Sequence, residues 1–253
     1  MLPPIYVISL ARAKEHRADI SSRLDSAGVA YQIIEAVDGE TLDLLTLKDR
    51  LVQDIYWFKK EKKMTVGETG CYLSHYNLWE RMVAEQTPFA LVLEDDAVWE
   101  DDFFEVVEQL VQSKYYWNVV HCACPKIGRI YSTLSKVGNN RKFVRFKHPM
   151  GITAAYLIDL DGAKKLQQHC YKIRDSIDMQ WLLYWQCNLY FYFVQPPPAQ
   201  GAIDETTIGS RPIAKNKHQL KSEMGVLKYL IKANRERYAR RFYHWTHPPK
   251  KRK

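Results

Sequence analysis

The sequence predicts an α/β protein: a single Rossmann-type domain with a mixed, mainly parallel sheet, followed by a basic helical tail. Two patterns carry this prediction. A strand, a helix and a second strand follow one another within about 35 residues, as in the βαβ unit of a parallel sheet. The apolar run Phe89–Leu93 is typical of a buried strand and ends in the acidic triplet Glu94, Asp95 and Asp96. We expect the domain to cover residues 1–215 and the tail residues 216–253.

The composition indicates an ordinary globular protein. Hydrophobic residues make up 46% of the chain, which is enough for a packed core. No apolar stretch approaches the roughly 20 residues of a membrane span, and the run Ile5–Leu10 is too short for a signal peptide. We therefore expect a cytoplasmic protein. The five cysteines include no Cys-x-x-Cys pair, so we expect free thiols instead of disulfides or a zinc knuckle.

The net charge of +8 comes from the tail. The segment from Val226 to Lys253 contains ten basic side chains and one acidic side chain, Glu236. The preceding residues carry almost no net charge. A nucleic-acid enzyme more often spreads positive charge along a groove of the folded body, so we expect no nucleic-acid partner.

The first βαβ unit is expected at the N-terminus. Its strands are Ile5–Leu10 and Tyr31–Val37, and the helix between them, from Ala13 to Ala27, ends at Gly28. The two strands should pair in parallel through a right-handed crossover.

Charged residues follow both of these strands. Arg12 and Arg17 come after the first strand, and Asp38 follows the second. They are either solvated loop charges or groups that hold the base, ribose or phosphates of a nucleotide, and the sequence alone leaves both readings open.

A glycine-rich segment precedes the next helix. Gly67 to Gly70 lead into a helix expected over Cys71 to Ala84, with Ser74 and His75 near its start. A histidine beside an apolar face is usually structural. However, a helix N-terminus preceded by glycines also presents free amide groups to an anion, so this segment could bind a diphosphate.

The acidic triplet is the main candidate for chemistry. Three adjacent carboxylates repel one another, and a divalent metal ion beside them would relieve the repulsion. The carboxyl edge of a parallel sheet is also where open α/β proteins bind ligands. A nucleotide-sugar site fits both observations. The second acidic pair, Asp101 and Asp102, precedes a helical pattern over 103–111 and is expected to cap that helix.

The remaining elements are assigned from shorter patterns. We expect strands over 119–122, 153–158 and 189–194, a helix over 161–170, a loop with a short helix over 40–66, and an irregular excursion with some strand content over 125–150. Asp178 precedes an apolar and aromatic run, so it is either an N-cap or a placed carboxylate. The pattern favours the cap.

The tail has helical periodicity. Apolar residues recur at Leu220, Met224, Leu227, Ile231, Tyr238, Phe242 and Trp245. One interpretation is a helix packed on its own domain with a solvated charged face. We prefer the other for its final third, an interfacial helix that lies on an anionic membrane surface.

Taken together, several blocks of the sequence resemble glycosyltransferase family 25, of the bacterial lipooligosaccharide galactosyltransferase type. These blocks are Val7–Leu10 with Arg17, Ala36–Gly39, Gly67–His75, Leu93–Ala97, Ala154–Ile158 with Gly162–Leu166, and Ile177–Asp178. Two departures concern the acceptor side: Ile152 separates Gly151 from Thr153, and Thr206 stands where the family has serine.

The resemblance implies a GT-A-like fold and transfer of galactose from UDP-galactose to a sugar of a lipooligosaccharide core. It also implies work at the cytoplasmic face of the inner membrane. Mn²⁺ or Mg²⁺ would be held by Asp96 with Asp95 or Glu94. Asp178 would accept the proton of the acceptor hydroxyl in an inverting displacement. The donor would contact Ser9, Leu10, Arg12, Arg17, Val37, Asp38, Glu68, Gly70, Ser74, His75, Glu94 and Asp95, and the acceptor Thr153, Gln200 and Thr206.

Other functions are compatible with the acidic residues. The donor could be UDP-glucose or another UDP-hexose. A glycoside hydrolase needs a pair of acids but no nucleotide, and a phosphohydrolase would use the triplet with two metal ions. A non-catalytic, membrane-associated sugar-binding or scaffold protein is disfavoured only by the intact triplet and Asp178.

Overall fold

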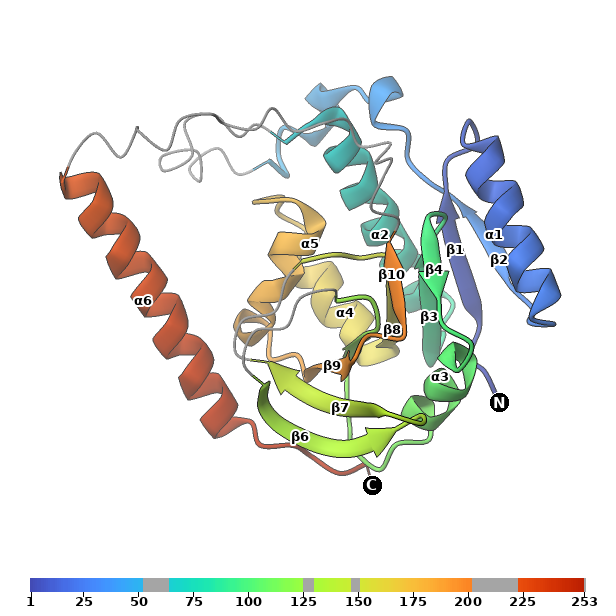
Figure 1. The fold of residues 1–253 in the computed structure, drawn as a ribbon. Helices are drawn as coiled ribbons and strands as arrows, with labels where there is room; N and C mark the ends of the chain where they lie inside the picture. Colours follow the sequence, from blue (N-terminus) through green and yellow to red (C-terminus); the bar gives the residue numbers. More distant parts are fainter. Residues whose placement is uncertain (52–63, 125–129, 147–150, 202–222, 253) are drawn as a thin grey trace.

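The computed structural model describes residues 1–51, 64–124, 130–146, 151–201 and 223–252, with side chains from residue 234 onward in the last range. Eight strands form one sheet in the order β2-β1-β3-β8-β5-β9-β7-β6 (Figure 1). Their bounds are β1 (Ile5–Ser9), β2 (Gln32–Glu35), β3 (Phe89–Glu94), β5 (Val119–His121), β6 (Ile130–Val137), β7 (Arg141–Phe146), β8 (Ala155–Asp159) and β9 (Phe191–Gln195).

The sheet is mixed, as the sequence predicts. β1 pairs in parallel with β2 and β3, and β5 pairs in parallel with β9. β8 runs antiparallel to both β3 and β5, and β7 runs antiparallel to β6 and β9. The α/β class is therefore confirmed, and the parallel pairs lie at the β2-β1-β3 end and at β5-β9.

The N-terminal βαβ unit forms where it is expected. Helix α1 (Lys14–Ser26) connects β1 to β2, and Gly28 follows the helix at a φ of +66°, a conformation that glycine adopts without strain. Ser9 pairs with Glu35 of β2, and Ile8 pairs with Glu94 of β3. The carboxyl ends of three parallel strands therefore meet at one edge of the sheet.

Helices cover both faces of the sheet because its strands alternate their side chains. Tyr6 and Ile8 of β1 share a core cluster with α2, whereas Ile5 and Val7 share one with α1. The first face is covered by α2 (Val66–Ala84), α4 (Leu160–His169), α5 (Ile177–Gln180) and the 3-10 helix η4 (Trp181–Gln186), and the second by α1 and α3 (Phe103–Val111).

Helix α2 begins more than a turn earlier than the sequence predicts. Thr65 caps it, and Glu68 completes a capping box by accepting a hydrogen bond from the Thr65 backbone amide at 2.9 Å. The glycines at 67 and 70 therefore lie inside the helix, and the prediction that they precede it is wrong. The stretch 40–66 is expected to be a loop with a short helix, and its described part begins with two short 3-10 helices, η1 (Gly39–Thr41) and η2 (Leu44–Leu47). Residues 52–63 of this stretch lie outside the described residues.

Asp102 does not cap α3 through its side chain, so that prediction is also wrong. It lies at the N-cap position, but its carboxylate binds Arg141 of β7, with the shortest contact at 2.7 Å. The pair attaches the β6–β7 hairpin to the start of α3.

The C-terminal helix α6 (Glu223–Thr246) packs against the body of the protein. The Tyr243 hydroxyl donates to the Leu189 carbonyl at 2.5 Å, and Tyr184 is hydrogen-bonded to His244 at 3.0 Å. After the helix, Lys251 forms a β-bridge with Tyr115. The expected boundary at 215 and 216 and the apolar positions 220, 224, 227 and 231 lie outside the described side chains. None of the helices described is long and apolar enough to cross a membrane.

Candidate functional site

A cleft of about 340 Å³ opens at the carboxyl ends of β1, β2 and β3. Its walls are the end of β1, the turn after β2, the start of α2 and the acidic triplet. Ten residues expected at a donor or metal site line it: Ser9, Leu10, Arg12, Val37, Asp38, Ser74, His75, Glu94, Asp95 and Asp96. Three expected at the donor, Arg17, Glu68 and Gly70, are not part of the lining and lie behind it.

One wall depends on glycines that allow two backbone segments to touch. A Cβ atom on Gly39 would lie 1.8 Å from the Val66 carbonyl oxygen, and one on Gly70 would lie 2.5 Å from the Val37 carbonyl oxygen. Ser74 fastens the same turn, because its Oγ accepts a hydrogen bond from the Val37 amide at 2.8 Å. Gly70 and Ser74 therefore hold the turn after β2 against α2.

Arg12 and Asp38 form an ion pair at the rim of the cleft. The Arg12 Nε atom lies 2.8 Å from Asp38 Oδ2. This hydrogen bond, with another from the Glu40 amide, holds the pKa of Asp38 below its usual value. The rim thus presents a guanidinium and an ionised carboxylate, groups suited to the phosphates and ribose hydroxyls of a nucleotide.

Arg17 acts from behind the cleft by fixing the end of β1. Its guanidinium donates to the Ser9 carbonyl oxygen at 2.9 Å and to Glu35 at 3.0 Å. The Ser9 hydroxyl in turn donates to Asp95 Oδ2 at 2.7 Å. Arg17 therefore helps orient Asp95 through Ser9 without lining the cleft itself.

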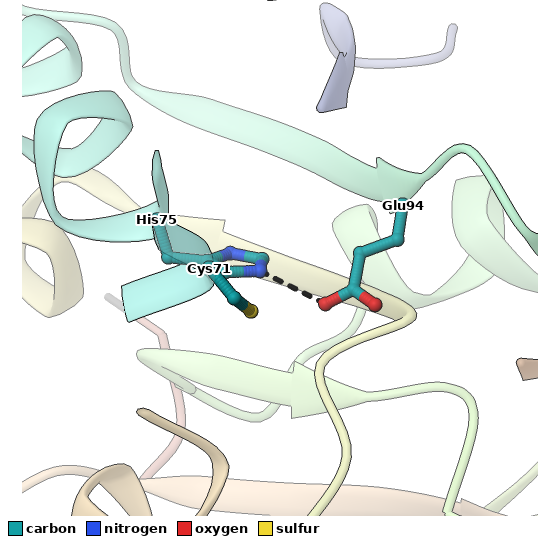
Figure 2. Close-up of side chains that lie close together, drawn as sticks. All are labelled: Cys71, His75 and Glu94. Atoms are coloured by element: carbon teal, nitrogen blue, oxygen red, sulfur yellow. Dashed lines mark hydrogen bonds and ion pairs between the residues drawn. The ribbon is translucent and has the colours of Figure 1, made fainter. Parts of the chain in front are cut away.

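Glu94 is held from two sides. His75 Nε2 lies 3.0 Å from its Oε1 atom (Figure 2). The Thr153 hydroxyl donates to the same oxygen at 2.5 Å. Burial alone would raise the pKa of Glu94, but the hydrogen bonds from His75 and Thr153 outweigh it and keep this pKa below its usual value. Glu94 is therefore a fixed, ionised carboxylate.

His75 belongs to a buried chain of hydrogen bonds. Trp79 Nε1 can only donate, and it lies 3.1 Å from the Tyr156 hydroxyl, which lies 2.9 Å from His75 Nδ1. We assign the Tyr156 hydroxyl as the donor to His75 Nδ1, and His75 Nε2 as the donor to Glu94. Every polar group in this series of hydrogen bonds then has a partner. This tautomer is our assignment. The geometry supports the structural reading of His75.

Cys71, His75 and Glu94 form a cluster whose ligand atoms all lie within 4.8 Å of one another (Figure 2). A thiolate with an imidazole suits zinc more than Mn²⁺ or Mg²⁺. However, the Nε2 atom of His75 is already hydrogen-bonded to Glu94. Burial, with the charges of Glu94 and Asp178, also raises the pKa of the Cys71 thiol well above its usual value. The cluster is therefore better described as a support for Glu94 than as a metal site.

Asp96 has the properties expected of a cation ligand. Its Oδ1 atom is buried and has no hydrogen-bond partner among the described residues. Burial, together with the carboxylates of Glu94 and Asp95, raises the pKa of Asp96 to about 7. Burial also raises the pKa of Asp95, although Ser9 donates to it. Hard oxygen donors with one unsatisfied atom fit Mn²⁺ or Mg²⁺, which prefer carboxylate oxygens.

Asp178 is not an N-cap, so the cap interpretation favoured by the pattern is wrong. Ser176 occupies the N-cap position of α5, and Asp178 lies in its first turn. Gly151 lies directly beside it, and Asp178 is close enough to Cys71 to raise the pKa of that thiol. No described residue forms a hydrogen bond or ion pair with its carboxylate. Asp178 thus places a carboxylate near Cys71, a residue of the cleft lining.

The residues expected at the acceptor are dispersed. Thr153 is buried under Glu94 and donates to it. Gln200 is exposed in β10 (Ala199–Gly201), which pairs antiparallel with β4 (Ala97–Trp99), so Gly201 lies opposite Ala97 beside the triplet. Thr206 falls outside the described residues.

Comparison with known proteins identifies the family. The model of glycosyltransferase family 25, described as an LPS biosynthesis protein family, matches residues 2–181. The chain belongs to glycosyltransferase family 25. The matched segment contains the cleft, the acidic triplet and Asp178.

Curated relatives include proteins named as galactosyltransferases and proteins named as inactive family members. The chain is 33% identical over 180 residues to rat "probable inactive glycosyltransferase 25 family member 3", in an alignment that covers 64% of this chain and 29% of the relative. It is 38% identical over 171 residues to a glycosyltransferase 25 family member of Anopheles gambiae, in an alignment that covers 65% of this chain and 28% of that relative. It is 27% identical over 169 residues to human procollagen galactosyltransferase 2, in an alignment that covers 64% of this chain and 27% of that relative. The chain thus spans less than a third of each of these relatives.

Several residues that matter to the cleft were not singled out from the sequence. Cys71 and His75 are four residues apart on a helix and therefore share a face, a signal that could have placed Cys71 in the lining. His16 and Thr65 also line the cleft. Tyr156 could not have been found, because its hydroxyl meets His75 only through the pairing of β8 with β3.

Proposed function

We propose that this chain transfers galactose from UDP-galactose to a sugar of a lipooligosaccharide or lipopolysaccharide core, in a metal-dependent, inverting reaction at the cytoplasmic face of the inner membrane. Family membership supports glycosyl transfer, and the galactosyltransferase name of a relative supports the choice of hexose. UDP-glucose or another UDP-hexose is the alternative donor.

The donor would lie in the cleft at the ends of β1, β2 and β3. The turn after β2, with Val37 and Asp38, would contact the nucleoside from one side, while Ser9, Leu10 and Arg12 approach from the other. This assignment uses a wall that Gly39, Gly70 and Ser74 already hold in place, so the protein would need little rearrangement to bind the nucleotide.

The diphosphate would lie against the acidic triplet. Mn²⁺ or Mg²⁺, when bound, supplies positive charge that neutralises the diphosphate as it leaves. Asp96 would hold the ion with Asp95, and Glu94, fixed by His75 and Thr153, adds charge beneath them. Asp95 is oriented for this role by Ser9 and Arg17.

Asp178 would act as the general base. An inverting transfer needs one carboxylate that accepts the proton of the acceptor hydroxyl as that oxygen attacks the sugar. Asp178 is separate in sequence from the triplet and has no described partner that would compete for this proton. Proton removal and donor binding would thus belong to different carboxylates.

The buried, unpartnered Oδ1 atom of Asp96 is the observation that carries this proposal. It is tested by thermal melting with UDP and MnCl₂, because a ligand at 100 times its Kd stabilises the folded state by about 2.7 kcal/mol. The wild type and the control Asp101→Asn, which alters an exposed carboxylate, should both be stabilised. Asp96→Asn should lose the part of this stabilisation that depends on manganese. Absence of any shift in the wild type would overturn the donor and metal assignments.

Turnover requires a separate measurement. A panel of UDP-sugars assayed against short saccharide acceptors identifies the donor, and Asp178→Asn should abolish transfer while leaving UDP binding unchanged. Asp175→Asn, on the same segment, is the matched control. Equal loss of transfer and UDP binding in Asp178→Asn would move Asp178 to the donor or metal site.

A non-catalytic sugar-binding or scaffold role is the second candidate, and the inactive relatives favour it. The two candidates differ in one result. A scaffold would bind UDP or a UDP-sugar in the melting experiment but would release no UDP with any donor and acceptor of the panel.

A further inference from the structure

The outward face of α6 carries a stripe of exposed aromatic side chains. Tyr238, Phe242 and Trp245 are 65%, 63% and 75% exposed. Their spacing of four and then three residues places them on one face of the helix. Large aromatic groups that share an exposed face indicate a surface for interaction more strongly than isolated ones do. We call these three residues the aromatic stripe.

The opposite face of the same helix fixes the direction of the stripe. Tyr243 and His244 are each 5% exposed, and they are hydrogen-bonded to the body through Leu189 and Tyr184. Arg240 lies over the ring of Trp185, with its guanidinium carbon 4.5 Å from the ring centre. Because the inner face is held at these points, the stripe cannot rotate into the protein without breaking these contacts.

Arginines flank the stripe on both sides. Arg235 and Arg241 lie three residues before and three residues after Tyr238, which on a helix places them about 60° to either side of it. Both are exposed, as is Arg237 further round the helix. Glu236, the one acid among the described side chains of α6, lies toward the face that packs against the body. The outer surface is therefore aromatic at its centre and cationic at its edges.

We propose that this face of α6 binds the surface of an anionic phospholipid bilayer. Tyr and Trp place an apolar ring and a polar atom at the level of the lipid headgroups, and arginine keeps its charge in the headgroup layer while its stem lies along apolar surface. Anionic lipids attract the two flanking arginines. The helix lies on the bilayer and does not cross it, in accordance with the absence of a spanning helix among those described.

A second copy of this chain fits the surface less well. An isologous contact through the stripe would place the arginine edges of one helix beside those of the other, and like charges at an interface oppose association. Among the side chains of α6 that the structure describes, from residue 234 onward, the stripe has three large ones, and these alone supply less apolar area than a stable dimer usually buries.

The position of α6 is compatible with an accessible cleft. In Figure 1 the helix lies on one flank of the body, and β1, β2 and α1 lie on the opposite flank. A bilayer bound to the outer face of α6 would therefore leave the cleft open to the nucleotide. The inference does not depend on which reaction the cleft performs.

Flotation of the full chain with lipid vesicles tests the proposal. The wild type should float with vesicles of phosphatidylcholine containing 30% phosphatidylglycerol. With vesicles of pure phosphatidylcholine it should stay in the bottom fraction of the gradient. One basic residue near an anionic surface contributes about fivefold in affinity. Arg235→Glu/Arg241→Glu should therefore weaken binding about 25-fold or more. Lys14→Glu/Lys48→Glu makes the same change of net charge at exposed sites on other elements and should bind as the wild type does.

The aromatic contribution is tested separately. Phe242→Ser/Trp245→Ser should lower binding at least tenfold, whereas Leu45→Ser/Tyr171→Ser, at exposed apolar sites elsewhere, should not. Thermal melting of each variant verifies that it is folded.

Three results would overturn the proposal: no flotation of the wild type with anionic vesicles, equal binding by the stripe variants and their controls, or a wild-type dimer in light scattering that the stripe variants convert to monomers. The last would assign the stripe to a contact between copies of the chain.

Discussion

The backbone of Gly151 lies against Asp178 so closely that no side chain fits between them. A Cβ atom on Gly151 would lie 2.4 Å from the Asp178 carbonyl oxygen and 2.9 Å from its carboxylate Oδ2. Real Cβ contacts of this length do not occur, so a residue other than glycine must displace α5 or the backbone segment that contains residue 151. Gly151 is thus a positioning residue for Asp178.

Replacement of Gly151 by alanine should therefore reduce turnover without weakening donor binding. We expect Gly151→Ala to lower kcat at least tenfold, since a general base displaced from its position loses much of its effect. The Kd for UDP should change less than twofold. Gly201→Ala is the control, because its Cβ would meet side chains and no backbone: those of Ala154 and Ile152 at 3.2 Å, and Asp96 Oδ2 at an ordinary contact distance of 3.8 Å. A Gly151→Ala enzyme with wild-type kcat would remove Asp178 from the role of base.

The hydroxyl of Tyr156 should be important for stability. Tyr156→Phe would leave buried Trp79 Nε1 and His75 Nδ1 without a partner, and an unsatisfied buried polar group costs about 1–3 kcal/mol. The free energy of unfolding in urea should fall by that amount. Tyr192→Phe is the matched control, because the Tyr192 hydroxyl is buried with no described partner and its removal should be neutral or stabilising. Equal effects of the two substitutions would contradict the hydrogen-bond chain.

Local patterns in the sequence were sufficient for much of the fold. The β1-α1-β2 unit follows from periodicity and from Gly28, which are properties of neighbouring residues. The start of α2 was misplaced because Gly67 and Gly70 look like helix breakers. Gly70 allows α2 to contact the turn after β2, which only the folded chain reveals. The capping box of Thr65 and Glu68 was the local signal that could have corrected the start.

The sequence was sufficient to predict the site residues that follow the end of a single strand. It was not sufficient to predict contacts between residues that are far apart in the sequence. The acidic triplet lines the cleft because β3 ends there. The partner of Asp102 is 39 residues away in β7, and Thr153 reaches Glu94 across 59 residues. No periodicity encodes such pairs. For the same reason, a basic amphipathic pattern could not show which face of α6 is packed against the body.

Gly39 should be needed for nucleotide binding. An alanine Cβ at this position would lie 1.8 Å from the Val66 carbonyl oxygen, and both segments are backbone that cannot rotate away. Gly39→Ala should separate the turn after β2 from α2 and lower UDP affinity at least tenfold in calorimetry. Gly28→Ala provides the contrast: nothing lies within 4 Å of its Cβ, but its φ of +66° is strained for alanine. That variant should lose about 1 kcal/mol of stability and retain UDP affinity. Retained affinity in a folded Gly39→Ala protein would mean that this wall does not contact the nucleotide.

Packing of α6 should depend on pH through His244. Burial, with the charge of nearby Arg145, lowers the pKa of His244 to about 3, from 6.5 in an unfolded chain. Between these values the unfolded state binds more protons than the folded state, so the stability contributed by neutral His244 is complete above pH 6.5 and is lost as the pH falls towards 3. We expect the free energy of unfolding of the wild type to fall relative to His244→Phe between pH 7.5 and pH 5, with a slope of up to about 1.4 kcal/mol per pH unit. The difference between the two proteins removes the contribution of His121, whose pKa burial also lowers, to about 4. A constant difference across this range would show that His244 is exposed to solvent and that α6 is not held to Tyr184.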